Sequence, residues 1–341
     1  MPQRVPGKLD IAQVYNDSWR GWPVRPHDRQ HPFRGSFLDP RPDPELGAIY
    51  HDGIDVAVRD DRPERGAPAG RTHRVYAIEG GPVFLATPPG ARGFARIGHF
   101  GYGHIDPVVQ MGETVVPGQH IGWTCIGDWH LHLSEFVVTS GPPLVVNPLR
   151  PSGKLRPYGD TARPEIREIR FYTPASPAWT RRPKTSVARL PPAGTRVSRE
   201  RLFGRVDVRV RVSDPQSFIG WFRELPWLAA PHHPYRLAVT MTNLATGRMV
   251  RRREAFRAEQ LLDLPAGRHF APGTEQNLPA GGCMLRHSTM RCDGVYWFRL
   301  FPQYWDTTRL SDGRYEVRVR AWDVAGNLAS TSVAIRIANG L

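Results

Sequence analysis

Short runs of alternating apolar and polar residues recur along this chain, separated by glycine and proline. In the first half they are GIDVAV at 53–58, RVYAI at 74–78, GPVFLAT at 81–87 and FARIGHFGYGHI at 94–105. Alternation with a period of two predicts strands, because successive side chains of a strand point to opposite faces. No long segment has the 3.6-residue period of a helix, so we expect mainly antiparallel sheet with long loops.

The same alternation returns in longer runs in the second half. In GRVDVRVRVSD at 204–214, valines alternate with charged residues, which predicts a strand with one apolar and one basic face. YEVRVRAWD at 315–323, the turn residues VAGN and the run STSVAIRIAN predict a closing hairpin. Such strands indicate a β-sandwich. We interpret residues 250–305 as a loop-rich insertion into this β-sandwich, with a short helix in RREAFRAEQLL at 252–262.

A polar segment rich in proline and glycine, RPSGKLRPYGDTARPE, separates these two halves. A length of 341 residues suits two domains, since domains commonly contain about 100 to 200 residues. We therefore predict an N-terminal extension at 1–30, a first domain at 31–160 and a sandwich domain at 165–341, both mainly β.

The net charge of +14 comes almost entirely from arginine, because the chain has only three lysines. Such charge suits nucleic acid, anionic lipid or an anionic wall polymer, although a GC-rich coding bias toward arginine explains it equally well. No nucleic-acid-binding motif, Walker A loop, GxSxG elbow or dinucleotide fingerprint is present. Charge alone therefore identifies no partner.

Three features of the sequence bear on localisation and redox state. No apolar run approaches the roughly 20 residues of a membrane span, so we expect no transmembrane segment. The opening MPQRVPGKLD lacks the pattern of a signal peptide, so a signal was removed or export follows another route. Cys283 and Cys292 could form a disulfide or remain two free thiols, and Cys125 is left over.

The segment DWHLHLSEF at 128–136 places His130 and His132 on one face of a predicted strand, about 6 to 7 Å apart. One imidazole could bind a metal ion while the other lies over its open coordination position. The alternative is a pair of histidines with a purely structural role.

The segment YHDGIDVAV at 50–58 contains His51 and Asp55. In a straight strand the two would lie about 13 Å apart, but the turn-forming pair Asp52-Gly53 can fold them together. With one histidine of the pair at 130 and 132 they make a set of two nitrogens and one oxygen, which suits a catalytic Zn²⁺ with an open position. A closed site that includes the Cys125 thiolate is the alternative.

Three motifs now stand in order: H-x-G-x-D at 51–55, Y-x-H at 102–104 leading into V-x-x-G-x-x-V-x-x-G-x-x-I-G at 109–122, and H-x-H at 130–132. Their order and spacing resemble the M23 peptidases, the lysostaphin and LytM-like zinc endopeptidases that cut peptidoglycan peptides. The resemblance covers roughly residues 30 to 150. One departure is the bulky segment GWTCIGDW before H-x-H, where the family has glycine and serine.

The resemblance implies a role for each of five residues. His51, Asp55 and His132 would bind zinc, and His104 and His130 would be catalytic. His130 would act as general base and His104 would donate a hydrogen bond to the developing oxyanion, or the two roles would be exchanged. His99 is an alternative to His104. Glu135, on the opposite strand face, is expected to support the fold.

The implied activity is zinc-dependent hydrolysis of peptide cross-links or stems of bacterial peptidoglycan, with one zinc ion per chain. The expected protein is a monomer in the cell envelope or outside the cell. It would bind peptidoglycan peptides as substrate and an anionic wall polymer, but not nucleic acid. The second half is similar to bacterial Ig-like or fibronectin-like sandwiches. The competing interpretation is a catalytically inactive M23-fold envelope protein that acts as a cell-wall binding or activator module.

Overall fold

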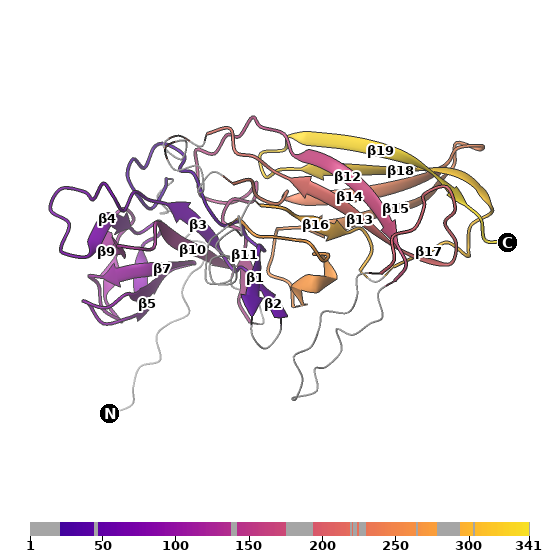
Figure 1. The fold of residues 1–341 in the computed structure, drawn as a ribbon. Coiled ribbons are helices and arrows are strands. Elements are labelled where there is room, and N and C mark those ends of the chain that lie inside the picture. The colour runs from indigo at the N-terminus through magenta and orange to yellow at the C-terminus, as the bar shows by residue number, and fades with distance from the viewer. Residues whose placement is uncertain are drawn as a thin grey trace, which may run out of the picture. The chain divides into compact units, whose positions relative to one another are not determined.

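The computed structural model is mainly β and is built from antiparallel sheets (Figure 1), which confirms the predicted fold class. It describes residues 21–340 except 44–46, 138–141, 175–193, 219, 221–223, 225–229, 264, 278–293 and 303. The chain divides into two compact units, Met1–Phe33 with Asp52–Gly159, and Arg34–His51 with Asp160–Leu341. The domain limits drawn from the sequence stay predictions.

The described part of the first unit contains one nine-stranded sheet. Its strands are β3 (Ile54–Ala57), β4 (Arg71–Tyr76), β5 (Gly81–Ala86), β6 (Gly93–Ile97), β7 (Phe100–Pro107), β8 (Thr114–Val115), β9 (His120–Cys125), β10 (His130–Val137) and β11 (Leu144–Val146).

Strand β10 positions both histidines of the H-x-H motif. Its first half pairs with β3 and its second half with β11, while β7 pairs with its middle. The register places His132 opposite Asp55 on one side and opposite Gly103 on the other. Leu131 and Leu133 alternate with the histidines and are fully buried. The core therefore holds one face of β10 and leaves the histidines on the other.

Glu135 lies on the buried face of β10 and has only 1% of its side chain exposed. Burial raises its pKa, which the Arg150 guanidinium opposes. Two hydrogen bonds, of 2.6 and 2.8 Å, join the two side chains. Glu135 thus belongs to a buried ion pair of the fold, as its position on the strand predicts.

The second unit contains two four-stranded sheets and a hairpin, within the part of the chain described. The hairpin is β1 (Pro40–Asp43) with β2 (Gly47–Tyr50). One sheet has β12 (Glu165–Tyr172), β13 (Arg205–Ser213), β16 (Trp297–Arg299) and β17 (Trp305–Asp306), and the other has β14 (Arg236–Asn243), β15 (Met249–Arg257), β18 (Gly313–Trp322) and β19 (Leu328–Ile337). The described residues of this unit also include a short 3-10 helix, η3 (Ala266–Arg268).

The closing hairpin is present as β18 and β19. The two strands pair along their whole length, with Gly313 opposite Ile337 at one end and Trp322 opposite Leu328 at the other. The helix predicted at 252–262 is wrong, because residues 249–257 form β15. That strand pairs with β14 through two register shifts. These irregularities interrupt the alternation of apolar residues, and cross-strand pairing outweighs the helix preference of the Arg, Glu and Ala residues.

Within the described ranges, no helix has the length and apolar character that a membrane span requires.

We expect Arg150→Met to destabilise the first unit by about 3 kcal/mol, because it leaves the Glu135 carboxylate buried without its partner. Urea denaturation followed by tryptophan fluorescence measures the change. The double variant Glu135→Leu/Arg150→Met should recover most of the loss, since it removes both charges. A single variant as stable as the wild type would contradict this account.

Candidate metal centre

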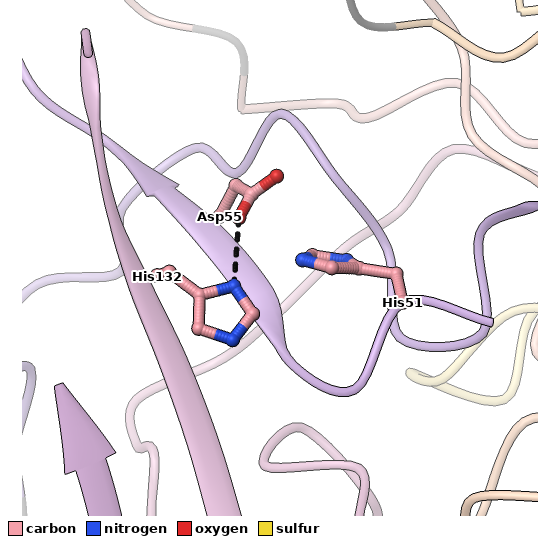
Figure 2. Close-up of side chains that lie close together, drawn as sticks. All are labelled: His51, Asp55 and His132. Atoms are coloured by element: carbon pink, nitrogen blue, oxygen red, sulfur yellow. Dashed lines mark hydrogen bonds and ion pairs between the residues drawn. The ribbon is translucent and has the colours of Figure 1, made fainter. Parts of the chain in front are cut away.

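Three side chains predicted as ligands lie together. His51, Asp55 and His132 each offer one ligand atom, and these atoms lie within 4.8 Å of one another (Figure 2). His51 and Asp55 are buried, and His132 is half-buried. Two imidazole nitrogens and one carboxylate oxygen are donors that divalent transition metals accept, so this group could hold a metal ion. Distances to such an ion of roughly 2.0–2.2 Å would draw the atoms closer together.

Gly53 allows the segment between His51 and Asp55 to lie against β10. A Cβ atom at this position would lie 2.6 Å from the Leu133 carbonyl oxygen and 2.7 Å from Cε1 of His132. Both distances are shorter than non-bonded contacts permit. The glycine of the H-x-G-x-D motif is therefore required for close packing against the His132 ring.

A backbone carbonyl orients His51. Its Nδ1 lies 2.8 Å from the Ser36 carbonyl oxygen, which can only accept a hydrogen bond. Arg41 Nη2 is also near this nitrogen, but at a longer distance of 3.3 Å. The shorter bond requires the proton of the neutral ring on Nδ1, which leaves the Nε2 lone pair available to a cation. Hydrogen bonds of this kind commonly orient metal-binding histidines.

His132 lies between two carboxylates. Its Nδ1 is 3.2 Å from Asp55 and its Nε2 is 3.3 Å from Asp52. Burial by itself would lower the pKa of His132, but the hydrogen bonds and negative charges of Asp52 and Asp55 outweigh it and raise the pKa to about 9. The metal-free centre therefore attracts positive charge, and a metal ion must displace a proton to bind.

The two histidines predicted as catalytic lie beside this group. The His104 ring centroid is 4.6 Å from that of His130 and 6.0 Å from that of His132. His130 Nε2 is 3.5 Å from Asp55. His104 has a left-handed backbone with φ of 61°, which is uncommon for residues other than glycine. All five residues that the motifs single out thus lie close together.

Hydrogen bonds distinguish the two rings by where they carry a proton. His130 Nδ1 is 2.5 Å from the Asp128 backbone carbonyl, so it donates, and the neutral ring has its lone pair on Nε2. His104 Nδ1 is 2.5 Å from Nη2 of Arg92, and arginine has no acceptor. His104 Nδ1 must therefore accept, and the proton lies on Nε2. Burial, with the positive charge of Arg92, lowers the pKa of His104, which favours this neutral form.

Arg92 and Asp128 are site residues that the sequence motifs did not reveal. Arg92 forms two hydrogen bonds of 2.8 Å to the Asp128 carboxylate while it contacts His104. Asp128 thereby supports both histidines, His130 through its carbonyl and His104 through Arg92. Asp128 could have been suspected from its place just before the H-x-H motif. Arg92 could not, because it lies in the loop-like segment PPGARG, which contains no motif.

Two of the alternative site residues lie elsewhere. His99 Nδ1 is 2.8 Å from Glu79, whose other oxygen is 2.5 Å from Lys154. Cys125 is buried, burial raises its pKa, and it is not part of the potential ligand group. Cys283 and Cys292 lie outside the described residues, so their pairing stays open.

The first half of the bulky segment before H-x-H, residues 122–125, is buried in the interior of the first unit, whereas Ile126 is 62% exposed. Trp123 is 7% exposed, and the Arg74 guanidinium lies 4.4 Å from its ring centroid. Asp60 accepts hydrogen bonds from the backbone of Gly127 at 2.6 Å and Trp129 at 2.9 Å. The segment thus packs Trp123 and Cys125 inward and presents a tight loop ahead of His130.

Comparisons with known proteins gave no match, since no protein-family model, curated protein or solved structure matches this chain.

We expect Gly53→Ala to abolish stoichiometric binding of Zn²⁺ or Co²⁺, because the added methyl group displaces the His132 ring or the segment that carries His51 and Asp55. Metal titration with the absorption bands of Co²⁺ measures this. Gly159→Ala is a matched control, because its Cβ would meet only Gln30 at 3.8 Å. Unchanged metal binding by Gly53→Ala would contradict the proposed packing.

We expect binding of a divalent ion at neutral pH to release about one proton, because His132 with a pKa of about 9 is protonated in the metal-free protein. Below that pKa, the apparent affinity for the metal ion should rise about tenfold for each unit by which the pH is raised. Calorimetric titration in two buffers of different ionisation enthalpy counts the protons. The Asp52→Asn variant should release fewer protons on metal binding, because it lacks one of the two carboxylates that raise the pKa of His132. Affinity that does not change between pH 7 and pH 9 would contradict this prediction.

Proposed function

We propose that this protein is a zinc-dependent endopeptidase that hydrolyses peptides of bacterial peptidoglycan. The observation that carries the proposal is the position of two further histidines, His104 and His130, beside the group His51, Asp55 and His132. A metal site with three protein ligands and neighbouring acid-base groups is typical of catalytic rather than structural zinc. A structural site would more often be closed by four ligands, frequently cysteine.

The donor set supports zinc in particular. His51 and His132 offer imidazole nitrogens and Asp55 a carboxylate, a combination found in zinc hydrolases. When bound, the ion supplies Lewis acidity, which polarises a carbonyl oxygen and lowers the pKa of a water molecule. The Ser36 carbonyl holds the His51 ring in the tautomer that such binding requires.

The tautomers of the two remaining histidines support a division of roles. His130 has its lone pair on Nε2, on the side of Asp55, so it can accept the proton of an attacking water molecule. His104 has its proton on Nε2 and can donate a hydrogen bond to the oxygen on which negative charge develops. Arg92 holds His104 in this form from the opposite ring nitrogen, and Asp128 holds Arg92.

The nature of the substrate rests on the resemblance of the three motifs to M23 peptidases. That resemblance also carries the proposed location in the cell envelope or outside the cell. An inactive binding module would share the fold but would have no use for two histidines held in complementary tautomers. The donor pattern around His104 and His130 therefore favours the enzyme.

We expect the purified wild type to contain about one zinc ion per chain, and His51→Ala or Asp55→Ala to lose it. Elemental analysis after gel filtration measures the stoichiometry. His73→Gln serves as a control, because His73 is a half-buried histidine of the first unit, outside the ligand group, whose Nδ1 lacks a hydrogen-bond partner among the described residues. A folded wild type that neither contains nor binds zinc would refute the proposal.

Catalysis is tested separately from metal binding. We expect His130→Ala to retain zinc but to lower the rate of sacculus clearing at least a hundredfold, in line with the loss of a general base. Turbidity of purified peptidoglycan measures clearing, and mass spectrometry of defined muropeptides identifies the bond cleaved. Zinc-loaded wild type that binds sacculi without releasing fragments would favour the inactive module instead.

A further inference from the structure

The sheet made of β14, β15, β18 and β19 has two chemically different faces. Leu237, Val239, Val317 and Val319 on its inner face are fully buried. The residues that alternate with them point outward and are rich in arginine. We call this outward surface the arginine face; its arginines are Arg236, Arg252, Arg257, Arg314, Arg318, Arg320 and Arg336.

The pairing of the strands arranges these arginines in rows across the sheet. One row runs from Arg252 through Thr240 and Arg318 to Ser332. Along β18, Arg318 and Arg320 lie on the same face, about 7 Å apart. Neighbouring strands are about 4.8 Å apart, so Arg252 and Arg318, two strands apart, are separated by about 10 Å. The positive groups therefore form a two-dimensional array.

Small residues separate the arginines. Ala238 and Thr240 lie between them on β14, and Ser330, Ser332 and Ala334 continue the same face on β19. No bulky side chain from these positions blocks access to the guanidinium groups. Arg318 is 52% exposed and so accessible to an extended ligand, and the larger apolar residues of this face, Met249 and Leu328, lie at strand ends.

Acidic residues only partly compensate this charge. Within the four strands, Glu254 pairs with Arg236 and Arg257, and Glu316 pairs with Arg318. Glu259, just beyond β15, also pairs with Arg257, so seven arginines are matched by three glutamates and four positive charges are in excess. Four of the arginines, among the described residues, have no carboxylate within 4.0 Å: Arg252, Arg314, Arg320 and Arg336.

The other sheet of the same unit has a smaller excess of positive charge, since its strands contain six arginines and four acidic residues, compared with nine arginines and two glutamates here. There Arg167 pairs with Glu165, Arg170 pairs with Glu168, and Arg209 pairs with Asp207. A general bias toward arginine in the chain would affect both sheets alike. It does not explain why the excess charge gathers on one of them.

The aromatic content of the arginine face limits the kind of ligand. Proteins that bind single-stranded nucleic acid stack bases on aromatic rings. The only aromatic residue that the four strands present outward is Trp322, and Arg236 and Arg320 lie 4.7 and 5.8 Å from its ring centroid. Its ring is thus engaged by cations rather than free for stacking.

We propose that the arginine face binds a linear phosphate polymer that lacks bases. Guanidinium groups bind phosphate oxygens through paired, charge-assisted hydrogen bonds. An array of them can contact several phosphates of one chain, and each contact adds to the salt dependence of binding. The surface lies within the second unit, so the proposal does not depend on zinc or on peptidase activity.

Long-chain inorganic polyphosphate is the probe, and fluorescence anisotropy of labelled polymer at several salt concentrations measures binding to the full chain. The test variant is Arg318→Gln/Arg320→Gln. Its charge-matched control is Arg167→Gln/Arg199→Gln, whose arginines are 60% and 57% exposed and lie outside the arginine face. Both variants remove two positive charges. Thermal denaturation verifies that each is folded.

We expect the test variant to weaken binding about tenfold or more and to reduce the salt dependence by roughly two ion equivalents, while the control changes affinity less than about twofold. Equal losses in both variants would overturn the proposal, because net charge alone would then explain binding. Tighter binding of a single-stranded DNA oligomer than of polyphosphate of equal charge would overturn the assignment to a polymer without bases. The single variant Arg252→Gln, on a different strand, should show about half of the loss in ion equivalents.

Discussion

The pairing of β10 with β3 is the interaction on which the candidate centre depends. This pairing places His132 opposite Asp55 and leaves both side chains on one face of the sheet. The opposite face of β10 is held by Leu131 and Leu133 in the core, so a slip of one residue would bury the histidines and expose the leucines. The apolar core thus fixes the register, and the register fixes the position of the potential ligands.

Electrostatics then organise the residues around this pair. Asp52 and Asp55 surround His132 with negative charge, while Arg92 supplies positive charge on the far side of His104. Asp128 balances Arg92 with its carboxylate and orients His130 with its carbonyl. The charges therefore differ across the site: carboxylates lie on both sides of His132, whereas an arginine lies next to His104 and, with burial, lowers its pKa.

The strands and the grouping of the candidate ligands could be predicted from the sequence. Alternation of apolar and polar residues identifies strands, and the spacing of residues in HDGID and HLH limits which side chains can lie close together. The ion pair of Glu135 could be anticipated only as a buried position, since Arg150 lies in a separate loop. Arg92 was beyond prediction, because its contact with Asp128 spans 36 residues and depends on how the segment before β6 folds. The strand at 249–257 was mistaken for a helix because its register shifts break the period of two. Local patterns therefore predict elements well, but contacts that depend on loop conformation or on strand irregularities require the structure.

The left-handed backbone of His104 has a consequence for the stability of the fold around it. This conformation costs a residue with a side chain roughly 1 kcal/mol, a cost that glycine would avoid. Leu38 and Trp129 have the same left-handed conformation, so the chain bears this cost at three described positions that are not glycine. At His104 the same turn that lowers stability directs the imidazole toward the rings of His130 and His132, so local backbone strain and the grouping of the three rings come from one dihedral angle.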